Sequence, residues 1–146
     1  MPISISVEGA DNLKMKERIR EIIKKGTSYT TQELIRSLKS NSPVRTGYLK
    51  KWFPTKKSDL MYTVKSPAHY VGFVNDGTGI YGPRKTPIYS KKVGAPLVFQ
   101  ANGGIVAVKY IRGQKGQKFV ERSIEETGPK VERLFIRAAA ETDGVI

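Results

Sequence analysis

The chain has 146 residues, of which 38% are hydrophobic and 27% are charged, and this size and composition predict a single globular domain spanning residues 1–146. It contains no cysteine, which excludes disulfide bonds and thiolate metal sites. No apolar run approaches the roughly 20 residues that a membrane span requires, and the first residues lack the pattern of a signal peptide, so we expect a soluble protein made in a cytoplasm, without a membrane partner.

The net charge of +13 is concentrated in the middle of the chain. Residues 41–118 carry fourteen Lys and Arg but two Asp and Glu, whereas residues 1–40 carry eight against five and residues 119–146 carry four against six. A middle segment with a net charge of +12 favours binding to polyanions or to acidic protein surfaces, with an affinity that falls as salt is added. The alternative is a solvated surface that only keeps the protein soluble.

The N-terminal part, residues 1–41, is predicted to contain a short strand and then one long helix. Apolar and polar residues alternate over residues 3–7, which is the period of a strand. From Asp11 the apolar residues recur at spacings of three and four, the period of an amphipathic helix that ends near Ser40. The members of this stripe are Met15, Ile19, Ile22, Ile23, Gly26, Thr30, Leu34 and Leu38.

Three local signals refine this helix. Asp11 or Asn12 can cap its start, because a short side-chain oxygen accepts hydrogen bonds from the free amides of the first turn. The sequence GTSYTT at residues 26–31 has poor helix propensity and predicts a bend. Pro43 disfavours helical dihedral angles at the preceding residue and so ends the element.

The middle part, residues 42–118, is predicted to form an antiparallel sheet. Thr46 and Gly47 suit a turn. Aromatic or alternating apolar residues predict strands over residues 48–53, 59–65 and 69–75. The sheet is thus predicted to begin directly after the turn.

A long basic loop rich in Gly and Pro follows over residues 76–95, and loops of this length in compact domains are usually functional or disordered. Residues 97–101 and 105–111 then predict a hairpin, because Asn102, Gly103 and Gly104 between them tolerate positive φ angles.

The C-terminal part, residues 119–146, follows a second loop, RGQKGQK, and is predicted to be helical. Its apolar residues between Val120 and Ala138 have helical spacing, and Pro129 after Gly128 predicts either a kink or two consecutive helices. The expected fold class is therefore α+β, in which the long N-terminal helix and the C-terminal helix pack on an antiparallel β-sheet that carries the long basic loop.

Few residues could support catalysis. His69 is the only histidine, and Asp59 and Asp76 are the only carboxylates of the middle part. These three residues could in principle serve a metal-independent hydrolase, but a packed or exposed histidine and two turn-forming aspartates are the simpler interpretation. The sequence contains no phosphate-binding Gly-Lys-Ser/Thr motif. We predict neither an enzyme nor a cofactor or metal site.

A nucleic-acid surface has better support. Four lysines lie close in sequence to Tyr48, Trp52 and Phe53, and basic residues among aromatic ones are typical of surfaces that stack single-stranded bases. The four are Lys50, Lys51, Lys56 and Lys57. The alternative is that Trp52 and Phe53 belong to the core and the lysines are merely exposed. Sequence-specific recognition is not indicated, because no helix-turn-helix, zinc-finger or RNP-like motif is present.

Three strings in order resemble the tail-completion, or head-tail joining, proteins of long-tailed bacteriophages, and they cover nearly the whole chain. They are PVRTGYL at residues 43–49, YVGFVNDGTG at residues 70–79 and FVERSI at residues 119–124. Arg45 stands where that family usually has an acidic residue, and Asn75 and Asp76 stand where it tends to have Glu and an aromatic residue. The proline that usually flanks the position of Phe119 is missing as well.

The resemblance implies a structural protein of the virion neck, without catalytic activity, that forms a ring of about six copies. Its partners would be copies of itself, the head connector or stopper proteins, and the tail terminator or tail tube proteins. We expect a contact loop that orders when a neighbouring ring docks, and nonspecific contact between Lys50, Lys51, Lys56 and Lys57 and the DNA in the channel. The loop residues are Gly77, Thr78, Gly79, Tyr81, Arg84, Lys85, Lys91 and Lys92. The alternative function is that of a small basic nucleic-acid-binding protein of the cytoplasm.

Overall fold

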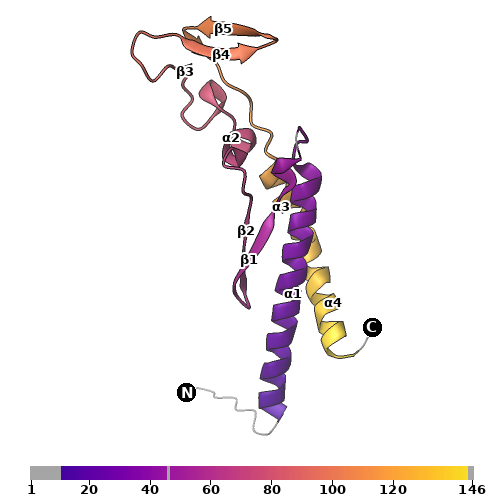
Figure 1. The fold of residues 1–146 in the computed structure, drawn as a ribbon. Helices are drawn as coiled ribbons and strands as arrows, with labels where there is room; N and C mark the ends of the chain where they lie inside the picture. The colour runs from indigo at the N-terminus through magenta and orange to yellow at the C-terminus, as the bar shows by residue number, and fades with distance from the viewer. Residues whose placement is uncertain (1–10, 46, 145–146) are drawn as a thin grey trace, which may run out of the picture.

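The computed structural model describes residues 11–45 and 47–144. The strand predicted over residues 3–7 and the side chains of Asp11 and Asn12, predicted to cap the helix, lie outside the described residues. The described part mixes helices with small antiparallel sheets, which confirms the α+β class. The molecule is elongated, with a helical body at one end and an arm at the other (Figure 1). We define the arm as residues 77–117.

The predicted long helix is confirmed as α1, Asp11–Asn41. It continues without interruption through residues 26–31, where we predicted a bend, and Figure 1 shows one nearly straight rod. The hydroxyls of Thr27, Thr30 and Thr31 donate to the carbonyl oxygens four residues earlier, at 2.7–2.9 Å. Because these hydroxyls use acceptors within the helix, the threonines fit an α-helix despite their low propensity.

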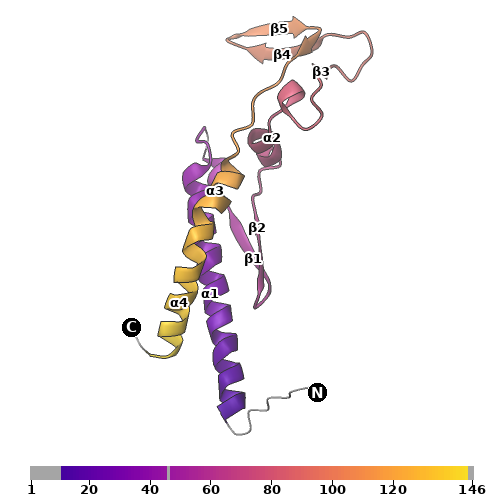
Figure 2. The same cartoon turned by 180° about the vertical axis from the view of Figure 1, so that it is seen from behind.

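The C-terminal part forms the two consecutive helices that Gly128 and Pro129 predicted. They are α3, Phe119–Thr127, and α4, Val131–Thr142, joined by a 3-10 turn at Gly128–Lys130. Both run antiparallel to α1 along one side of it, as Figures 1 and 2 show. The three helices form the helical body.

A small core lies where the end of α1 meets the start of α3. Leu38, Trp52 and Phe119 form its buried centre, and the Trp52 and Phe119 rings meet edge to face with their centroids 6.4 Å apart. The Trp52 indole N–H donates to Ser42 Oγ at 3.2 Å, so the one polar atom of that ring has a partner. The core therefore joins three distant parts of the chain.

The predicted single sheet is wrong, because the strands within residues 47–144 form three separate antiparallel pairs. The first pair is β1, Phe53–Ser58, with β2, Met61–Lys65, and it lies beside α1. The second pair is β3, Ile88–Tyr89, with β6, Tyr110–Ile111. The third pair is β4, Leu97–Ala101, with β5, Gly104–Val108, at the end of the arm (Figure 1). The helices consequently pack on one another, and they do not cover a sheet face as predicted.

The strand predicted over residues 48–53 is mostly a 3-10 turn, Tyr48–Lys50, and β1 begins only at Phe53. The turn predicted before it is present at Gly47, whose φ is 75°. The short helical turn places Leu49 and Trp52, three residues apart, both in buried positions. A strand would have placed these two side chains on opposite faces.

The strand predicted over residues 69–75 is also wrong, since Val71–Asp76 is the helix α2. Val71 and Val74 pack against the core and Asn75 is buried, whereas Phe73 is 64% exposed. This is a helical period, so the alternation of Val71 and Phe73 that suggested a strand does not describe which side chains are covered.

The loop predicted over residues 76–95 is not structureless, because it contains a 3-10 turn at Gly79–Tyr81 and the strand β3. The hairpin after it is confirmed as β4 and β5. Its turn residues Asn102 and Gly103 have φ values of 49° and 81°, the left-handed pair that favours a tight two-residue connection. The second predicted strand is divided at Lys109 into β5 and β6.

Candidate assembly surface

The two ends of the arm are joined to each other at its base by a crossing of two backbone segments, residues 77–82 and 112–116. The Thr78 amide donates to the Gln114 carbonyl oxygen at 2.8 Å, and the Ile80 amide donates to the Arg112 carbonyl oxygen at 2.8 Å. The Gln114 amide donates in return to Thr78 Oγ1 at 2.9 Å. We call this contact the crossing, and it closes the base of the arm into a loop.

Glycine is required at the crossing because the two backbones nearly touch. A Cβ atom on Gly79 would lie 2.0 Å from the Arg112 carbonyl oxygen, and one on Gly113 would lie 2.1 Å from the Thr78 carbonyl oxygen. Both glycines also have positive φ values, 63° and 95°. Any larger residue at either position would force the segments apart.

The buried side chain of Asn75 connects α2 to the start of α3. Its Oδ1 accepts a hydrogen bond from the Val120 amide at 2.9 Å, so it caps a helix to which it does not belong. Its Nδ2 donates to both carboxylate oxygens of Glu121, at 3.1 and 2.9 Å, and to Asp76 Oδ1 at 2.9 Å. Lys118 Nζ lies 3.5 Å from Asp76 Oδ1. This cluster fixes the direction in which the arm leaves the body.

The arm exposes a large amount of apolar surface. The hairpin β4–β5 makes no extensive contact with another helix or strand of the described part of the chain, and Val98 and Ile105 are 62% and 81% exposed. Other exposed apolar residues of the arm are Tyr81, Tyr89, Val93, Phe99, Val106 and Tyr110. No charged residue occurs from Val93 to Val108. Because an isolated two-stranded hairpin is marginally stable in water, this surface is suited to contact with another molecule.

The arm is also basic, and its positive charges are not neutralised. Its basic side chains are exposed and take part in no ion pair among residues 11–45 and 47–144. They are Arg84, Lys85, Lys91, Lys92, Lys109, Arg112 and Lys115. Four of these, Arg84, Lys85, Lys91 and Lys92, are loop residues that the sequence predicted as contacts.

The other predicted loop residues lie at the crossing, whereas these four lie in the exposed segment beyond it. Gly77, Thr78 and Gly79 lie in the crossing, where they hold backbone together. Tyr81 is 41% exposed, and Lys115 Nζ lies 5.8 Å from the centre of its ring. The predicted loop is therefore two units, a fixed base and an exposed basic segment from residue 83 onwards.

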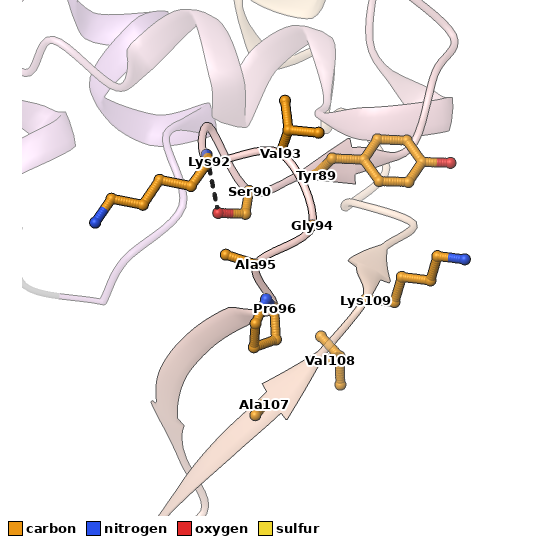
Figure 3. A pocket seen from close by; sticks show the side chains of 10 residues that line it. All are labelled: Tyr89, Ser90, Lys92, Val93, Gly94, Ala95, Pro96, Ala107, Val108 and Lys109. Carbon is orange, nitrogen blue, oxygen red and sulfur yellow. Dashed lines mark hydrogen bonds between the residues drawn. The ribbon is translucent and has the colours of Figure 1, made fainter.

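A groove of about 520 Å³ opens between the β3 region and the hairpin. Tyr89, Val93, Pro96 and Val108 give it apolar walls, and Lys92 and Lys109 extend on opposite sides of it in Figure 3. We call it the arm groove. Sequence reasoning did not select Tyr89, Val93 or Lys109, because the pairing of β3 with β6, which brings them together, has no local sequence signal.

A second hollow, of about 670 Å³, lies between Phe73, the crossing and residues 83–89. Arg84 lines it together with Pro83, Pro87 and Ile88. The two hollows place apolar and basic groups side by side along the arm.

The four lysines predicted to face DNA do not form one surface with Trp52, because Trp52 is buried in the core. Lys51 Nζ lies 5.2 Å from the ring centre of Tyr48, and Lys56 Nζ forms an ion pair with Asp59 Oδ1 at 2.8 Å. The carboxylate of Asp59 raises the pKa of Lys56, and the lysine lowers the pKa of Asp59. Of the aromatic residues predicted for stacking, Phe53 and Tyr48 are exposed.

The residues considered for hydrolysis lie on separate elements. Asp59 is in the β1–β2 turn, His69 precedes α2 with its ring against Tyr70, and Asp76 ends α2. Within the part of the chain that the structure describes, no three His, Asp or Glu residues are grouped so that they could hold a metal ion.

None of the helices that the structure describes is both long enough and apolar enough to cross a lipid bilayer.

In comparisons with known proteins, no family model, no curated protein and no solved structure matches this chain.

Proposed function

We propose that this chain is a structural protein of the phage neck, a ring-forming tail-completion protein that joins the connector of the DNA-filled head to the tail. The observation that supports this proposal most directly is the amount of exposed surface. The chain exposes 11449 Å², whereas a compact monomer of 16.3 kDa exposes roughly 7,500 Å². The excess of roughly 4,000 Å² exceeds the roughly 800 Å² that one partner contributes to a standard interface.

The distribution of that surface supports a subunit with two functional parts. The helical body is held by its own contacts, among them Lys130 with Glu33 at 2.6 Å and Arg18 with Asp143 at 2.5 Å. The arm is held at its base, where the Gln117 amide donates to the Val74 carbonyl oxygen at 3.0 Å, and its apolar and basic groups are exposed. In a ring of about six copies, each body would fix the position of a subunit, and each arm would reach a neighbouring subunit or the adjoining ring.

The proposal is tested by electron microscopy of particles made without this protein. We expect filled heads and complete tails that do not join, and joining should be restored when purified protein is added. Particles that join normally in its absence would contradict the proposal.

A second candidate is a small basic nucleic-acid-binding protein, and the unneutralised basic residues of the arm favour it. This function predicts submicromolar affinity for DNA or RNA and a steep loss of affinity with salt, because phosphate contacts release bound cations. The neck function predicts only weak, nonspecific binding. Fluorescence anisotropy with a labelled duplex and a labelled single strand, measured at increasing salt, separates the two.

A further inference from the structure

We propose that the arm groove binds the outer face of α3 and α4 of a second copy of this chain. The proposal rests on the ring-forming function proposed above and names the two surfaces that meet. It follows from two complementary features of the structure, an apolar groove flanked by lysines and a strip of exposed isoleucines and carboxylates, neither of which forms ion pairs among the residues that the structure describes.

The groove side is defined by its chemistry. Its walls are apolar, and Lys92 and Lys109 flank it without an ion pair in the part of the chain that the structure describes. Val93 at its edge is fully exposed, so no other side chain packs over it in the isolated chain. A groove of this kind fits an apolar side chain that has acidic neighbours.

The helical side has that composition. Ile124 and Ile136 are 55% and 61% exposed although they lie in amphipathic helices. Glu125 and Glu132 are exposed on the same two helices, and neither takes part in an ion pair among the described residues. We call these four residues the acidic strip.

The acidic strip is exposed, and Glu125 faces away from α1. Residues 119, 123 and 127, which are buried, lie on the opposite side of α3 from residue 125, because successive residues of a helix are about 100° apart. Glu125 is therefore free to meet a partner, and the other three members of the strip are exposed as well. The exposed basic residues of the same two helices are Arg122, Arg133 and Arg137, so the strip is acidic only at Glu125 and Glu132.

The contact would be head to tail, since the arm and the strip are different surfaces of one subunit. Such contacts repeat from copy to copy and close into a ring when the rotation between neighbours permits. The charge division of the sequence fits this arrangement, because the basic part of one copy would meet the acidic part of the next.

Charge reversal tests the proposal. The arm variant is Lys92→Glu with Lys109→Glu, and the strip variant is Glu125→Lys with Glu132→Lys. Self-association of the full-length chain is measured by sedimentation equilibrium at low and high salt. We expect the wild type to associate more tightly at low salt, and each variant to associate roughly tenfold more weakly or worse. Thermal unfolding should be unchanged, since these side chains are exposed.

Two matched controls reverse the same number of charges elsewhere. They are Lys57→Glu with Lys65→Glu, and Glu17→Lys with Glu21→Lys, all exposed residues outside both surfaces. Both should associate like the wild type. A loss in the controls equal to that in the test variants would show that net charge alone controls association, and would overturn the proposal.

An equal mixture of the arm variant and the strip variant is the most discriminating test. Each variant alone brings like charges together, but in an equal mixture the acidic arm of one meets the basic strip of the other, and the basic arm meets the acidic strip. We therefore expect the mixture to regain association with the two variants alternating, as native mass spectrometry would detect. A wild type that stays monomeric at millimolar concentration and low salt, or a mixture that stays monomeric, would overturn the proposal.

The outcome is distinguishable from failure of the neck function. If particles need this protein for joining and the reversed variants join and associate normally, the neck function holds and the contact is wrong. If the charge swap controls association but particles join without the protein, the contact holds and the neck function is wrong.

Discussion

At the scale of single residues, Asn75 links α2 to the start of α3 through its side-chain amide. It is a buried amide whose oxygen caps α3 and whose nitrogen donates to two carboxylates. Lys118, at the N-cap position of α3, makes no side-chain capping bond to the helix, and the cap comes instead from Asn75, which lies 45 positions before Val120, the residue whose amide it caps. Asn75 therefore couples the position of the arm to the helical body.

Replacing Asn75 by alanine should lower the free energy of unfolding by about 1–3 kcal/mol, because a helix cap and buried hydrogen bonds are lost together. Urea unfolding followed by circular dichroism measures the change. Gln100→Ala is the matched control, since it removes an exposed amide from β4 and should change stability by less than about 0.5 kcal/mol. Equal effects of the two variants would show that the hydrogen bonds of Asn75 do not stabilise the fold.

The crossing gives a second prediction at this scale. Gly79→Ala should destabilise the arm by more than about 1 kcal/mol, because alanine is strained at positive φ and its Cβ would meet the Arg112 carbonyl oxygen. Amide hydrogen exchange at residues 78–80 and 112–116 should become faster. Gly72→Ala in α2 is the control, because a Cβ there has no neighbour within 4 Å, and it should leave exchange at the crossing unchanged.

At the scale of elements, α1 and α4 approach closely at one glycine. A Cβ atom on Gly26 would lie 2.6 Å from the Phe135 ring. The Phe135 ring therefore occupies space that is free only because residue 26 has no side chain. This packing explains why a glycine stands in the predicted stripe of the helix, within a run of poor helix propensity.

Gly26→Ala should therefore destabilise the helical body by about 1–3 kcal/mol, although alanine is the better helix former. The second variant, Gly26→Ala with Phe135→Leu, should recover part of the loss, since the smaller side chain leaves room for the new methyl group. Thermal unfolding of both proteins gives the comparison. A stabilising effect of Gly26→Ala alone would show that helix propensity outweighs the contact.

A polar cluster joins the same two helices further along. The Tyr29 hydroxyl donates to Glu141 Oε2, and Arg137 Nε donates to Glu141 Oε1 at 2.8 Å while its guanidinium lies over the Tyr29 ring. The hydrogen bonds from Tyr29 and Arg137 lower the pKa of Glu141 below its usual value of 4.5, and the bond to Glu141 raises the pKa of Tyr29 above 10.0.

These shifts predict how stability depends on pH. Because the pKa of Glu141 is lower in the folded state, its stabilising contribution is complete above pH 4.5 and is lost as pH falls through the folded-state pKa. The pKa of Tyr29 is raised, so its contribution is complete below pH 10.0 and is lost as pH rises through the folded-state pKa. Because the two shifts arise from the same Tyr29–Glu141 hydrogen bond, the difference in unfolding free energy between wild type and either Glu141→Gln or Tyr29→Phe should be largest at intermediate pH and should shrink at both acid and alkaline pH. Differences that do not vary with pH would contradict this cluster.

At the scale of the whole molecule, the helical body and the arm differ in how they are held. The body is closed by helix packing, a small core and ion pairs, whereas the arm depends on the crossing, two short strand pairs and exposed loops. The segment from residue 83 to residue 95 carries the four basic residues among the predicted contacts and has few backbone hydrogen bonds to the rest of the chain. Segments of this kind open most easily.

Limited trypsin digestion tests this difference. In the isolated protein we expect first cleavage after Arg84, Lys85, Lys91 or Lys92, and in assembled particles we expect those bonds to be protected because a neighbour covers them. Lys115, exposed but within the crossing, should be cut later in both states. Equal cleavage of residues 84–92 in isolated and assembled protein would contradict ordering of the arm by a partner.

Sequence patterns predicted the elements whose signals are local. The apolar spacing of residues 11–41, the Asn102-Gly103 turn and the Gly128-Pro129 break each lie within one element or one connection, and all three are present. The strands predicted over residues 48–53 and 69–75 are wrong, because short apolar runs fit either period and contacts with distant residues decide between them. Of the candidate contact residues, the exposed basic ones were predictable from charge, whereas the fixed base of the loop was not.

The sequence by itself determined the long helix, the pair of C-terminal helices, the hairpin and the division of charge, because periodicity, turn residues and composition act over a few neighbouring positions. Only the tertiary structure decided that the strands it describes form three separate pairs, that Asn75 caps α3, and that two glycine-containing segments cross at the base of the arm. These features depend on contacts between residues tens of positions apart, such as the 45 positions between Asn75 and Val120, for which no local pattern carries a signal.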